Sequence, residues 1–305
     1  MNAGQLLQQA NQLKRLGQLD EAIALYYQAI EINSQFSWTY YELGDALAKQ
    51  GKLEEANIEF NKALKLNNIL GGLIKRHSNF DLLHESVADY NHIISQIFPE
   101  NPYNGFDFQQ YTEDLQSWNG RHEVFAQVIH EIKPKIIIEV GVWKGQSTIH
   151  MAEIAKEVDP TVVAISIDTF LGSPEHWEVN SPENYQASLQ LKHGYPRLYY
   201  QFIANVMWKG LENIVVPLPQ TSVNAAIMLK KLGIKGNILH IDAGHDFENV
   251  YSDLVNYWDL VAEGGVLIGD DFMPSWPEVE KAVRHFCSER NLEFSVNVPK
   301  YLIYK

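Results

Sequence analysis

The sequence contains few of the features that mark secreted or membrane proteins. It has one cysteine, Cys287, so no disulfide can form within the chain. It has no uninterrupted apolar stretch of about 18 residues, so we expect no membrane-spanning helix. The N-terminus lacks a basic segment followed by an apolar one, and we therefore expect no secretory signal. These absences favour a cytoplasmic location.

Positive charge is also scarce. The chain has 24 lysines and arginines against 38 aspartates and glutamates, which gives a net charge of -14 at pH 7. Nucleic acids and anionic membrane surfaces repel such a chain, so we expect no nucleic-acid partner and no membrane partner. At 305 residues, with 46% hydrophobic residues, the chain is long enough for two domains that each bury a core.

The first third of the chain repeats itself with a period of 34 residues. Such a period is typical of stacked helix pairs, with glycine in the turns, alanine where helices approach, and an aromatic ring between them. The matched pairs are Leu13 and Leu47, Gly17 and Gly51, Leu19 and Leu53, Glu21 and Glu55, Ala22 and Ala56, Tyr26 and Phe60, Ala29 and Ala63, and Asn33 and Asn67. These positions resemble the tetratricopeptide repeat over residues 3–68. Ala10 replaces the first consensus glycine, which the second repeat has as Gly44.

Two repeats alone bury little surface, so we expect the helical segment 69–97 to cap the stack and to complete a repeat domain over residues 1–97. The resemblance implies a groove for a protein or peptide partner. Residues 98–120 are interrupted by Pro, Asn and Gly but are rich in aromatic side chains. They are expected to form a linker, or an arm packed on the second domain. The second domain would span residues 121–305.

The second domain alternates short apolar strands with amphipathic helices, which predicts a parallel sheet covered on both faces. The expected strands lie at residues 135–140, 161–168, 213–218, 237–243 and 264–271. Two further strands, at 292–298 and 301–305, are so close in sequence that they predict an antiparallel hairpin. A parallel sheet that ends in such a hairpin is typical of the class I methyltransferase fold. The predicted fold class is therefore α/β, a Rossmann-like seven-stranded sheet with a C-terminal antiparallel hairpin, preceded by an all-α repeat domain.

The loop after the first strand has the features of a cofactor loop. Open α/β sheets bind ligands beyond the carboxyl ends of their strands, and residues 138–147 run from such an end into a helix. Gly141 and Gly145 allow a tight turn and close approach of a ligand. Ser147 lies at the helix start, where free amides favour a carboxylate such as that of S-adenosylmethionine. The loop lacks the glycine spacing of nicotinamide-binding and phosphate-binding loops. A purely structural turn is the alternative.

Two polar positions after later strands extend this expected cofactor site. Asp168 ends the second strand, where a carboxylate can accept hydrogen bonds from both ribose hydroxyls. Ser222, in the segment Gln220-Thr221-Ser222 after the third strand, lies where it can reach an adenine ring. A helix N-cap or a loop carboxylate is the alternative for Asp168, and an ordinary helix cap is the alternative for Ser222.

Three carboxylates lie at the ends of the fourth and fifth strands: Asp242, Asp270 and Asp271. Like charges this close raise one another's pKa, and a divalent cation such as magnesium, calcium or manganese removes that cost. His245 lies three residues after Asp242 and is the candidate general base. Salt bridges or helix caps for the acids, and a packing role for the histidine, are the alternatives. His240 lies within an apolar strand and is expected to be a core histidine.

The residues at 139–147 resemble a family motif. Glu-Val-Gly-Val-Trp-Lys-Gly-Gln-Ser is similar to the E-[LV]-G-x-[YW]-x-G-x-S motif of the catechol-type O-methyltransferases. The spacing of Asp242 and Asp270-Asp271 is similar to that family's metal triad. That family has an asparagine where this chain has Asp271, and a lysine base where this chain has His245.

Both departures are closer to the macrolide sugar O-methyltransferases and their macrocin-type relatives, which have an acidic last ligand. The sugar enzymes also use a histidine base. The stretch IDAGHDFENVYSDL, followed by GGVLIGDD, is similar to their I-D-G-x-H-x-[YF] and G-G-x-x-x-x-D-D signature, with Ala243 in place of a glycine.

The resemblance, which covers residues 121–305, implies S-adenosylmethionine as cofactor, with Glu139, Trp143 and Asp242 among the contacts. It also implies Mg²⁺ and O-methylation of a hydroxyl on a sugar or natural product, hence a small-molecule or glycan acceptor. Two alternatives are open: a methyltransferase for a protein docked on the repeats, and a scaffold with a degenerate transferase domain. The sequence leaves the oligomeric state open.

The segment 171–210 is longer than a simple connection needs. It is expected to form a lid with His176, Trp177 and Tyr185 as substrate contacts, or else an inert insertion.

Overall fold

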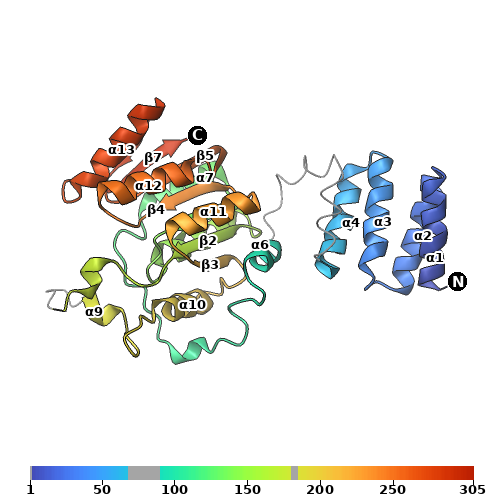
Figure 1. The fold of residues 1–305 in the computed structure, drawn as a ribbon, viewed down its shortest axis with the longest axis horizontal. Coiled ribbons are helices and arrows are strands. Elements are labelled where there is room, and N and C mark those ends of the chain that lie inside the picture. The colour runs from blue at the N-terminus through green and yellow to red at the C-terminus, as the bar shows by residue number, and fades with distance from the viewer. Residues whose placement is uncertain (1, 68–89, 180–184) are drawn as a thin grey trace. The chain divides into compact units, whose positions relative to one another are not determined.

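The chain divides into two compact units, residues 1–87 and residues 88–305 (Figure 1). The computed structural model describes residues 2–67, 90–179 and 185–305. Each unit has a hydrophobic core of its own.

The described part of the first unit consists of helices that pack in pairs. Gly17 has a φ of 79° and Gly51 a φ of 78°, and each forms the turn within a pair. Both turns lie where the 34-residue period predicts them, because residues other than glycine rarely adopt this backbone conformation. The helices are α1 (Ala3–Arg15), α2 (Leu19–Ile32), α3 (Ser37–Lys49) and α4 (Leu53–Leu66).

The repeated small and aromatic residues form the core of this unit. Tyr26 and Phe60 are buried, and the Tyr26 hydroxyl donates a hydrogen bond to Asn11 Oδ1 over 2.6 Å. A Cβ on Gly44 would lie 2.6 Å from the Phe60 ring, so glycine at this position allows the ring to pack against α3. The alternation of small and large residues therefore sets the spacing between the helices, as the sequence predicts.

The segment 69–97, predicted as a cap for the repeats, is placed differently where it is described. Residues 69–89 lie outside the described part of the chain. Helix α6 (Tyr90–Ile97) buries Tyr90, Ile93 and Ile94 in the core of the second unit. The second unit therefore begins before residue 98, because the apolar face of α6 packs against the sheet domain.

Residues 98–120 form an arm that packs on the second unit. Tyr103 is buried, and its hydroxyl donates a hydrogen bond to the Val215 carbonyl over 3.0 Å. Phe106 stacks on Tyr200, with 6.2 Å between the ring centroids. A short 3-10 helix, η2 (Phe108–Gln110), lies within the arm. The aromatic side chains thus explain why this segment is ordered without much regular structure.

A seven-stranded sheet forms the centre of the second unit, with the strand order β3-β2-β1-β4-β5-β7-β6. Strands β1 to β5 pair in parallel, and β7 pairs antiparallel with both β5 and β6. The predicted class I methyltransferase fold with its terminal hairpin is confirmed. The strands are β1 (Ile136–Val140), β2 (Val163–Asp168), β3 (Val215–Pro219), β4 (Gly236–Ile241), β5 (Val261–Gly269), β6 (Ser295–Asn297) and β7 (Lys300–Tyr304).

Helices cover both faces of this sheet (Figure 1). One face packs on α11 (Ser222–Leu232), α12 (Phe247–Trp258) and α13 (Pro277–Arg290), with α6 beside them. The other face packs on α7 (Glu123–Ile132), α8 (Gln146–Val158) and α10 (Leu198–Trp208). In the sequence, the shorter elements η3 (Pro174–Trp177) and α9 (Tyr185–Ser188) come between β2 and α10. In the part of the chain that the structure describes, no helix has the length and apolar character needed to cross a membrane.

The chain reverses its direction of winding at β1. After β1 the strands β2 and β3 add on one side, and after β3 the chain returns to add β4 and β5 on the other. The loops that leave β1 and β4 therefore diverge and leave a crevice at the carboxyl ends of the strands, where open sheets bind ligands.

Candidate active site

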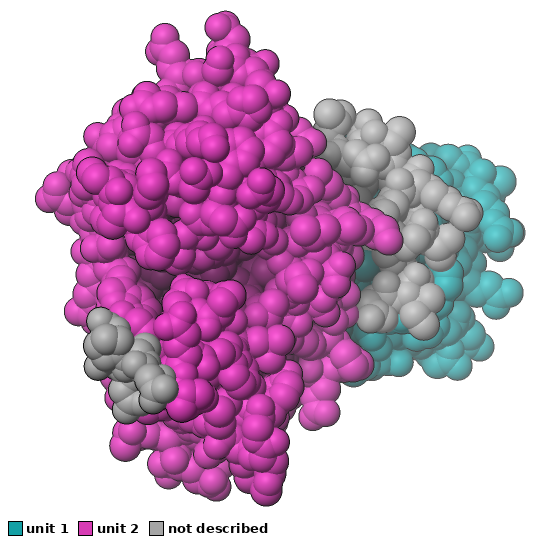
Figure 2. Space-filling view, turned by 60° about the vertical axis from the view of Figure 1, so that its left-hand side comes forward, with its two compact units in different colours: residues 1–87 teal, residues 88–305 magenta. Residues whose placement is uncertain are grey.

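A cleft of about 830 Å³ opens at the carboxyl ends of the parallel strands, and Figure 2 shows a hollow in this unit. It brings together residues from segments far apart in the sequence. The predicted residues that line it are Gly141, Trp143, Ser147, Asp168, Ser222, Asp242, His245, Asp270 and Asp271. Two predicted cofactor contacts, Glu139 and Gly145, are not among the lining residues.

Gly141 sets the shape of the loop between β1 and α8. Its φ is 83°, and a Cβ at this position would lie 1.7 Å from the Asp242 carbonyl oxygen. The end of β1 therefore passes against the end of β4 at a distance that only glycine permits. This approach places the cofactor loop directly beside the predicted metal ligand Asp242.

Asp168 holds the same loop from the side. Its Oδ2 accepts hydrogen bonds from the backbone N–H groups of Val142 (2.9 Å) and Trp143 (2.8 Å), and Oδ1 accepts one from Phe170 (2.7 Å). Burial raises the pKa of Asp168, and these backbone hydrogen bonds partly offset the rise. Asp168 therefore has the role of a loop carboxylate, which was one of the alternatives, and its contact with a ribose stays a prediction.

Glu139 and Gly145 have structural positions next to the cleft. Glu139 is 1% exposed, and its carboxylate accepts hydrogen bonds from the hydroxyls of Ser147 and Thr148. These two hydrogen bonds fix the start of α8. Gly145 is the N-cap of α8 with a φ of 90°, and a Cβ there would meet the Phe202 ring at 2.7 Å. These positions differ from the predicted direct contacts with a cofactor.

Lys144, which the sequence did not single out, anchors the loop to the arm. It is 2% exposed, and its Nζ bonds to Asp114 Oδ2 (2.6 Å) and to Gln116 Oε1 (2.8 Å). Asn205 of α10 donates hydrogen bonds to the carbonyl oxygens of Asp114 and Lys144. The arm is therefore part of the site's framework.

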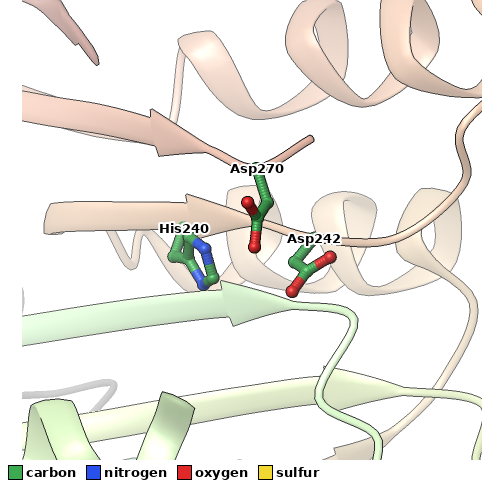
Figure 3. A group of neighbouring side chains, drawn as sticks. All are labelled: His240, Asp242 and Asp270. Atoms are coloured by element: carbon green, nitrogen blue, oxygen red, sulfur yellow. The ribbon is translucent and has the colours of Figure 1, made fainter. Parts of the chain in front are cut away.

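The acidic cluster forms as predicted at the ends of β4 and β5. Figure 3 shows the carboxylates of Asp242 and Asp270 close together, with His240 beside them on β4. Ligand atoms of Asp242, His245 and Asp271 also lie within 4.8 Å of one another. Burial raises the pKa of Asp242 well above its usual range, and the negative charge of Asp270 raises it further.

A row of buried polar side chains in contact with one another lies next to this cluster, and the sequence analysis did not predict it. Lys300, which is 0% exposed, forms an ion pair with Asp270. Its Nζ also lies 3.2 Å from His240 Nε2, and His240 Nδ1 lies 2.9 Å from Glu139 Oε1. The core position predicted for His240 is confirmed. Burial lowers the pKa of His240, and the positive charge of Lys300 lowers it further, so its imidazole is neutral.

His245 lies at the mouth of the acidic cluster. Its Nε2 is 3.0 Å from Asp271 Oδ2, and its ring stacks on Trp276 with 4.2 Å between centroids. Burial lowers the pKa of His245, but the hydrogen bond to Asp271 and its charge outweigh burial, so the net shift is upward. The imidazole is thus held in one orientation, as a general base requires.

An aromatic group forms another part of the cleft wall. His176 stacks on Trp143 at 4.2 Å, while Trp118 of the arm and Tyr185 pack around them. All four line the cleft. Trp177 does not, and its indole N–H donates a hydrogen bond to the Leu171 carbonyl. Of the three predicted lid residues, His176 and Tyr185 are therefore at the site; residues 180–184 lie outside the described part of the chain.

The segment after β3 caps a helix and also lines the cleft. Thr221 caps α11, since its hydroxyl accepts a hydrogen bond from the Asn224 N–H at 3.2 Å. Gln220, Thr221 and Ser222 all line the cleft. The helix-cap alternative therefore holds for Thr221, while Ser222 stays a candidate for the adenine site.

Asp253 of α12 also lines the cleft and was not predicted. It is 3% exposed, and burial raises its pKa to about 6, although a hydrogen bond with Ser222 lowers it. A carboxyl whose pKa rises on folding costs stability once it ionises. The cost is absent when the pH is below the pKa that Asp253 has in the unfolded chain. It grows with pH until the pH exceeds the pKa that Asp253 has in the folded protein.

We therefore expect Asp253→Asn to remove a pH-dependent cost of roughly 2 to 3 kcal/mol above about pH 7. Urea unfolding of both proteins at pH 5 and pH 7.5 measures this difference. The stability of the variant relative to wild type should increase between the two pH values. Asp259→Asn, at an exposed site, is the control and should show no such increase. An equal difference at both pH values would contradict the expectation.

Comparisons with known proteins agree with this architecture. Residues 138–272 match a family model described as a methyltransferase domain. Residues 10–51 match a model described as a TPR repeat, and residues 37–68 match one described as a tetratricopeptide repeat. A search of curated proteins gave no significant match.

Several solved structures resemble the chain at low identity. The O-methyltransferase NovP is 20% identical, with 61% of this chain and 79% of that chain covered and a TM-score of 0.45. An O-methyltransferase from Bacillus cereus in complex with SAH is 13% identical, with 72% and 98% covered and a TM-score of 0.43. CalS11, a TDP-rhamnose 3'-O-methyltransferase, is 15% identical, with 59% and 76% covered and a TM-score of 0.42.

The identity of the two units follows from the family models together with the sheet. Seven strands in the order β3-β2-β1-β4-β5-β7-β6, with a cleft at the carboxyl ends, surround the matched segment 138–272. The helical unit has the repeat period and the glycine turns of its matched models. Residues 138–272 therefore belong to a methyltransferase domain, and residues 10–68 carry tetratricopeptide repeats.

Proposed function

We propose that the protein transfers the methyl group of S-adenosylmethionine to a hydroxyl of a sugar or natural product. The observation that carries the proposal is that one cleft contains the Gly141 loop, the candidate ribose and adenine positions, and His245 paired with Asp271. A cofactor and an acceptor can therefore lie side by side above the strand ends. The similarity of residues 139–147 and 241–271 to sugar and natural-product O-methyltransferases supports the choice of acceptor.

In this proposal the cofactor extends along the ends of β1, β2 and β3. Its carboxylate would lie at the start of α8, where Ser147 lines the cleft and the helix dipole favours negative charge. Its ribose would lie near Asp168 and its adenine near Ser222. The indole Nε1 of Trp143 is buried and has no hydrogen-bond partner among the described residues, so it is a free donor beside this path.

The residues of this chain can position and deprotonate an acceptor. Asp271 accepts a hydrogen bond from His245 Nε2–H, which leaves the lone pair of Nδ1 to take a proton from the acceptor hydroxyl. S-adenosylmethionine supplies an electrophilic methyl group. As the acceptor oxygen forms its bond to the methyl carbon, the carbon–sulfur bond breaks and its electron pair stays on sulfur. The hydroxyl proton goes to His245, and alignment supplies much of the rate.

We also propose that Asp242 and Asp271 hold a divalent cation, with Mg²⁺ the fitting ion. Both line the cleft, and their carboxylate oxygens are the ligand type that Mg²⁺ prefers. When bound, the ion would polarise the acceptor hydroxyl. Asp270 fits the predicted ligand role less well, because Lys300 and the Asp271 N–H each bond one of its oxygens.

Calorimetric titration with S-adenosylhomocysteine tests the cofactor site. We expect wild type to bind at micromolar concentrations and Asp168→Asn to bind at least about tenfold more weakly. Asparagine has one acceptor oxygen and an NH2 group in place of the other, so it cannot accept the N–H groups of Val142, Trp143 and Phe170 together. Asp159→Asn is the matched control, because Asp159 pairs with Lys135 at the opposite ends of the strands. Absence of binding to wild type would refute the proposed function.

Transfer of a labelled methyl group to a panel of sugar and natural-product hydroxyls then tests the acceptor. Methylated oxygen on a panel member supports the proposal. Cofactor binding without transfer to any hydroxyl would instead direct the search to a protein acceptor docked on the repeats.

A further inference from the structure

A fully buried lysine lies directly behind the acidic cluster, and nothing in the proposed reaction uses it. Lys300 begins β7, which runs antiparallel to β5, and Tyr301 is paired with Gly269 at the end of β5. The Phe272 N–H donates a hydrogen bond to the Pro299 carbonyl over 2.8 Å. The hairpin thereby fixes the backbone of Lys300 beside the strand end that leads into Asp270.

The contacts of Lys300 hold its ammonium group against the carboxylate of Asp270. Its Nζ is bonded to Asp270 Oδ2, lies 3.2 Å from His240 Nε2, and lies 5.0 Å from the centre of the Phe125 ring. Asp270 is the carboxylate in direct contact with Lys300, so it compensates the charge of the lysine. A buried cation without such a partner is strongly unfavourable, so the pair is held together.

Both oxygens of Asp270 consequently already accept a bond from this chain. Oδ1 accepts the N–H of Asp271 at 2.8 Å, and Oδ2 faces Lys300. Asp242 and Asp271 line the cleft together with Asp270, and Asp271 is also bonded to His245. The cluster therefore contains three carboxylates, one lysine and one histidine. This is a smaller excess of negative charge than the three carboxylates alone provide.

We propose that Lys300 is a built-in counter-charge that competes with a metal ion for Asp270 and weakens binding of divalent cations in the acidic cluster. This inference rests on the proposed cation site. It implies that the cluster is stable without a metal ion. It also implies that removal of the lysine charge frees a third carboxylate and removes a repulsive charge from behind the ion.

Manganese titration, followed by the loss of the free Mn²⁺ electron paramagnetic resonance signal, tests this inference on the full-length chain. We expect wild type to bind Mn²⁺ with a Kd weaker than about 0.1 mM, in the range of low-affinity sites. Lys300→Met should bind about tenfold more tightly or better. Lys300→Met combined with Asp270→Asn should lose that gain, because the lysine acts through Asp270.

Lys305→Met is the matched control. Lys305 follows the same strand, but its Nζ donates to the Trp258 and Val261 carbonyls. Its loss should leave Mn²⁺ affinity unchanged. Equal affinity of Lys300→Met and wild type would overturn the inference, and so would a wild-type Kd below about 10 µM. Circular dichroism checks that Lys300→Met is folded; if it is not, Lys300→Gln replaces it, and the wild-type titration decides independently.

S-adenosylhomocysteine binding, measured on the same samples without metal, separates this inference from the proposed function. Loss of the cation effect with cofactor binding intact rejects the role of Lys300 alone. Failure of wild type to bind the cofactor rejects the proposed function whatever the manganese result.

Discussion

Gly141→Ala should destabilise the methyltransferase unit by about 3 kcal/mol or more and weaken S-adenosylhomocysteine binding at least about 100-fold. The added Cβ would lie 1.7 Å from the Asp242 carbonyl oxygen and 2.5 Å from its carbon. Both neighbours are backbone atoms at the end of β4, so no side-chain rotation can relieve the contact. Either the β1 loop or the β4 end must move, and each carries residues of the cleft. Urea unfolding and calorimetric titration measure the two effects.

Gly233→Ala is the matched control for Gly141→Ala. Gly233 ends α11 with a φ of 69°, and a Cβ there would have no atom within 4 Å. Only the cost of left-handed backbone applies, about 1 to 2 kcal/mol, and cofactor affinity should not change. If the two variants lost the same stability and both bound the cofactor normally, the close approach of β1 to β4 would not shape the site.

The order of elements could be predicted because local patterns determine it. The 34-residue repeat has glycines at both turns and alternates alanine with Tyr26 or Phe60, and the structure places these residues where the pattern requires. The alternation of apolar strands and amphipathic helices likewise predicts the parallel sheet. The final hairpin could be predicted because few residues separate its two strands in the sequence. These features depend on neighbours close in the sequence.

The site could be predicted only as far as strand ends locate it. Asp168, Asp242 and Asp271 come to the cleft because carboxyl ends of parallel strands lie at one edge. Glu139 and Gly145 were predicted as contacts from a motif, but motif membership does not separate a residue that touches a ligand from one that holds the loop. The direction of a side chain at a strand end, inward or toward the cleft, depends on its packing.

Lys300 and Lys144 were missed for a further reason. Lysine is rarely fully buried, so a single lysine in a sequence is assigned to the surface unless its partner is known. The partners are Asp270 and Asp114, each 30 residues away along the chain. For Lys300, the available signal was its position at the start of an apolar strand, next to a strand that ends in two aspartates. Pairing of β7 with β5 is needed to turn that signal into a contact.

His245→Ala should lower the rate of methyl transfer about 100-fold to 10,000-fold, the usual contribution of a general base, while S-adenosylhomocysteine affinity changes little. His245 touches the acidic cluster through Asp271 and stacks on Trp276, so its removal leaves the Gly141 loop and Asp168 unchanged. A rate measured at saturating cofactor and acceptor isolates the loss to proton removal. His285→Ala, at an exposed position on α13, is the control and should transfer methyl groups at the wild-type rate. Undiminished turnover by His245→Ala would mean that another group accepts the proton of the acceptor hydroxyl. A slow enzyme with normal cofactor affinity would support removal of that proton by His245, beside Asp271.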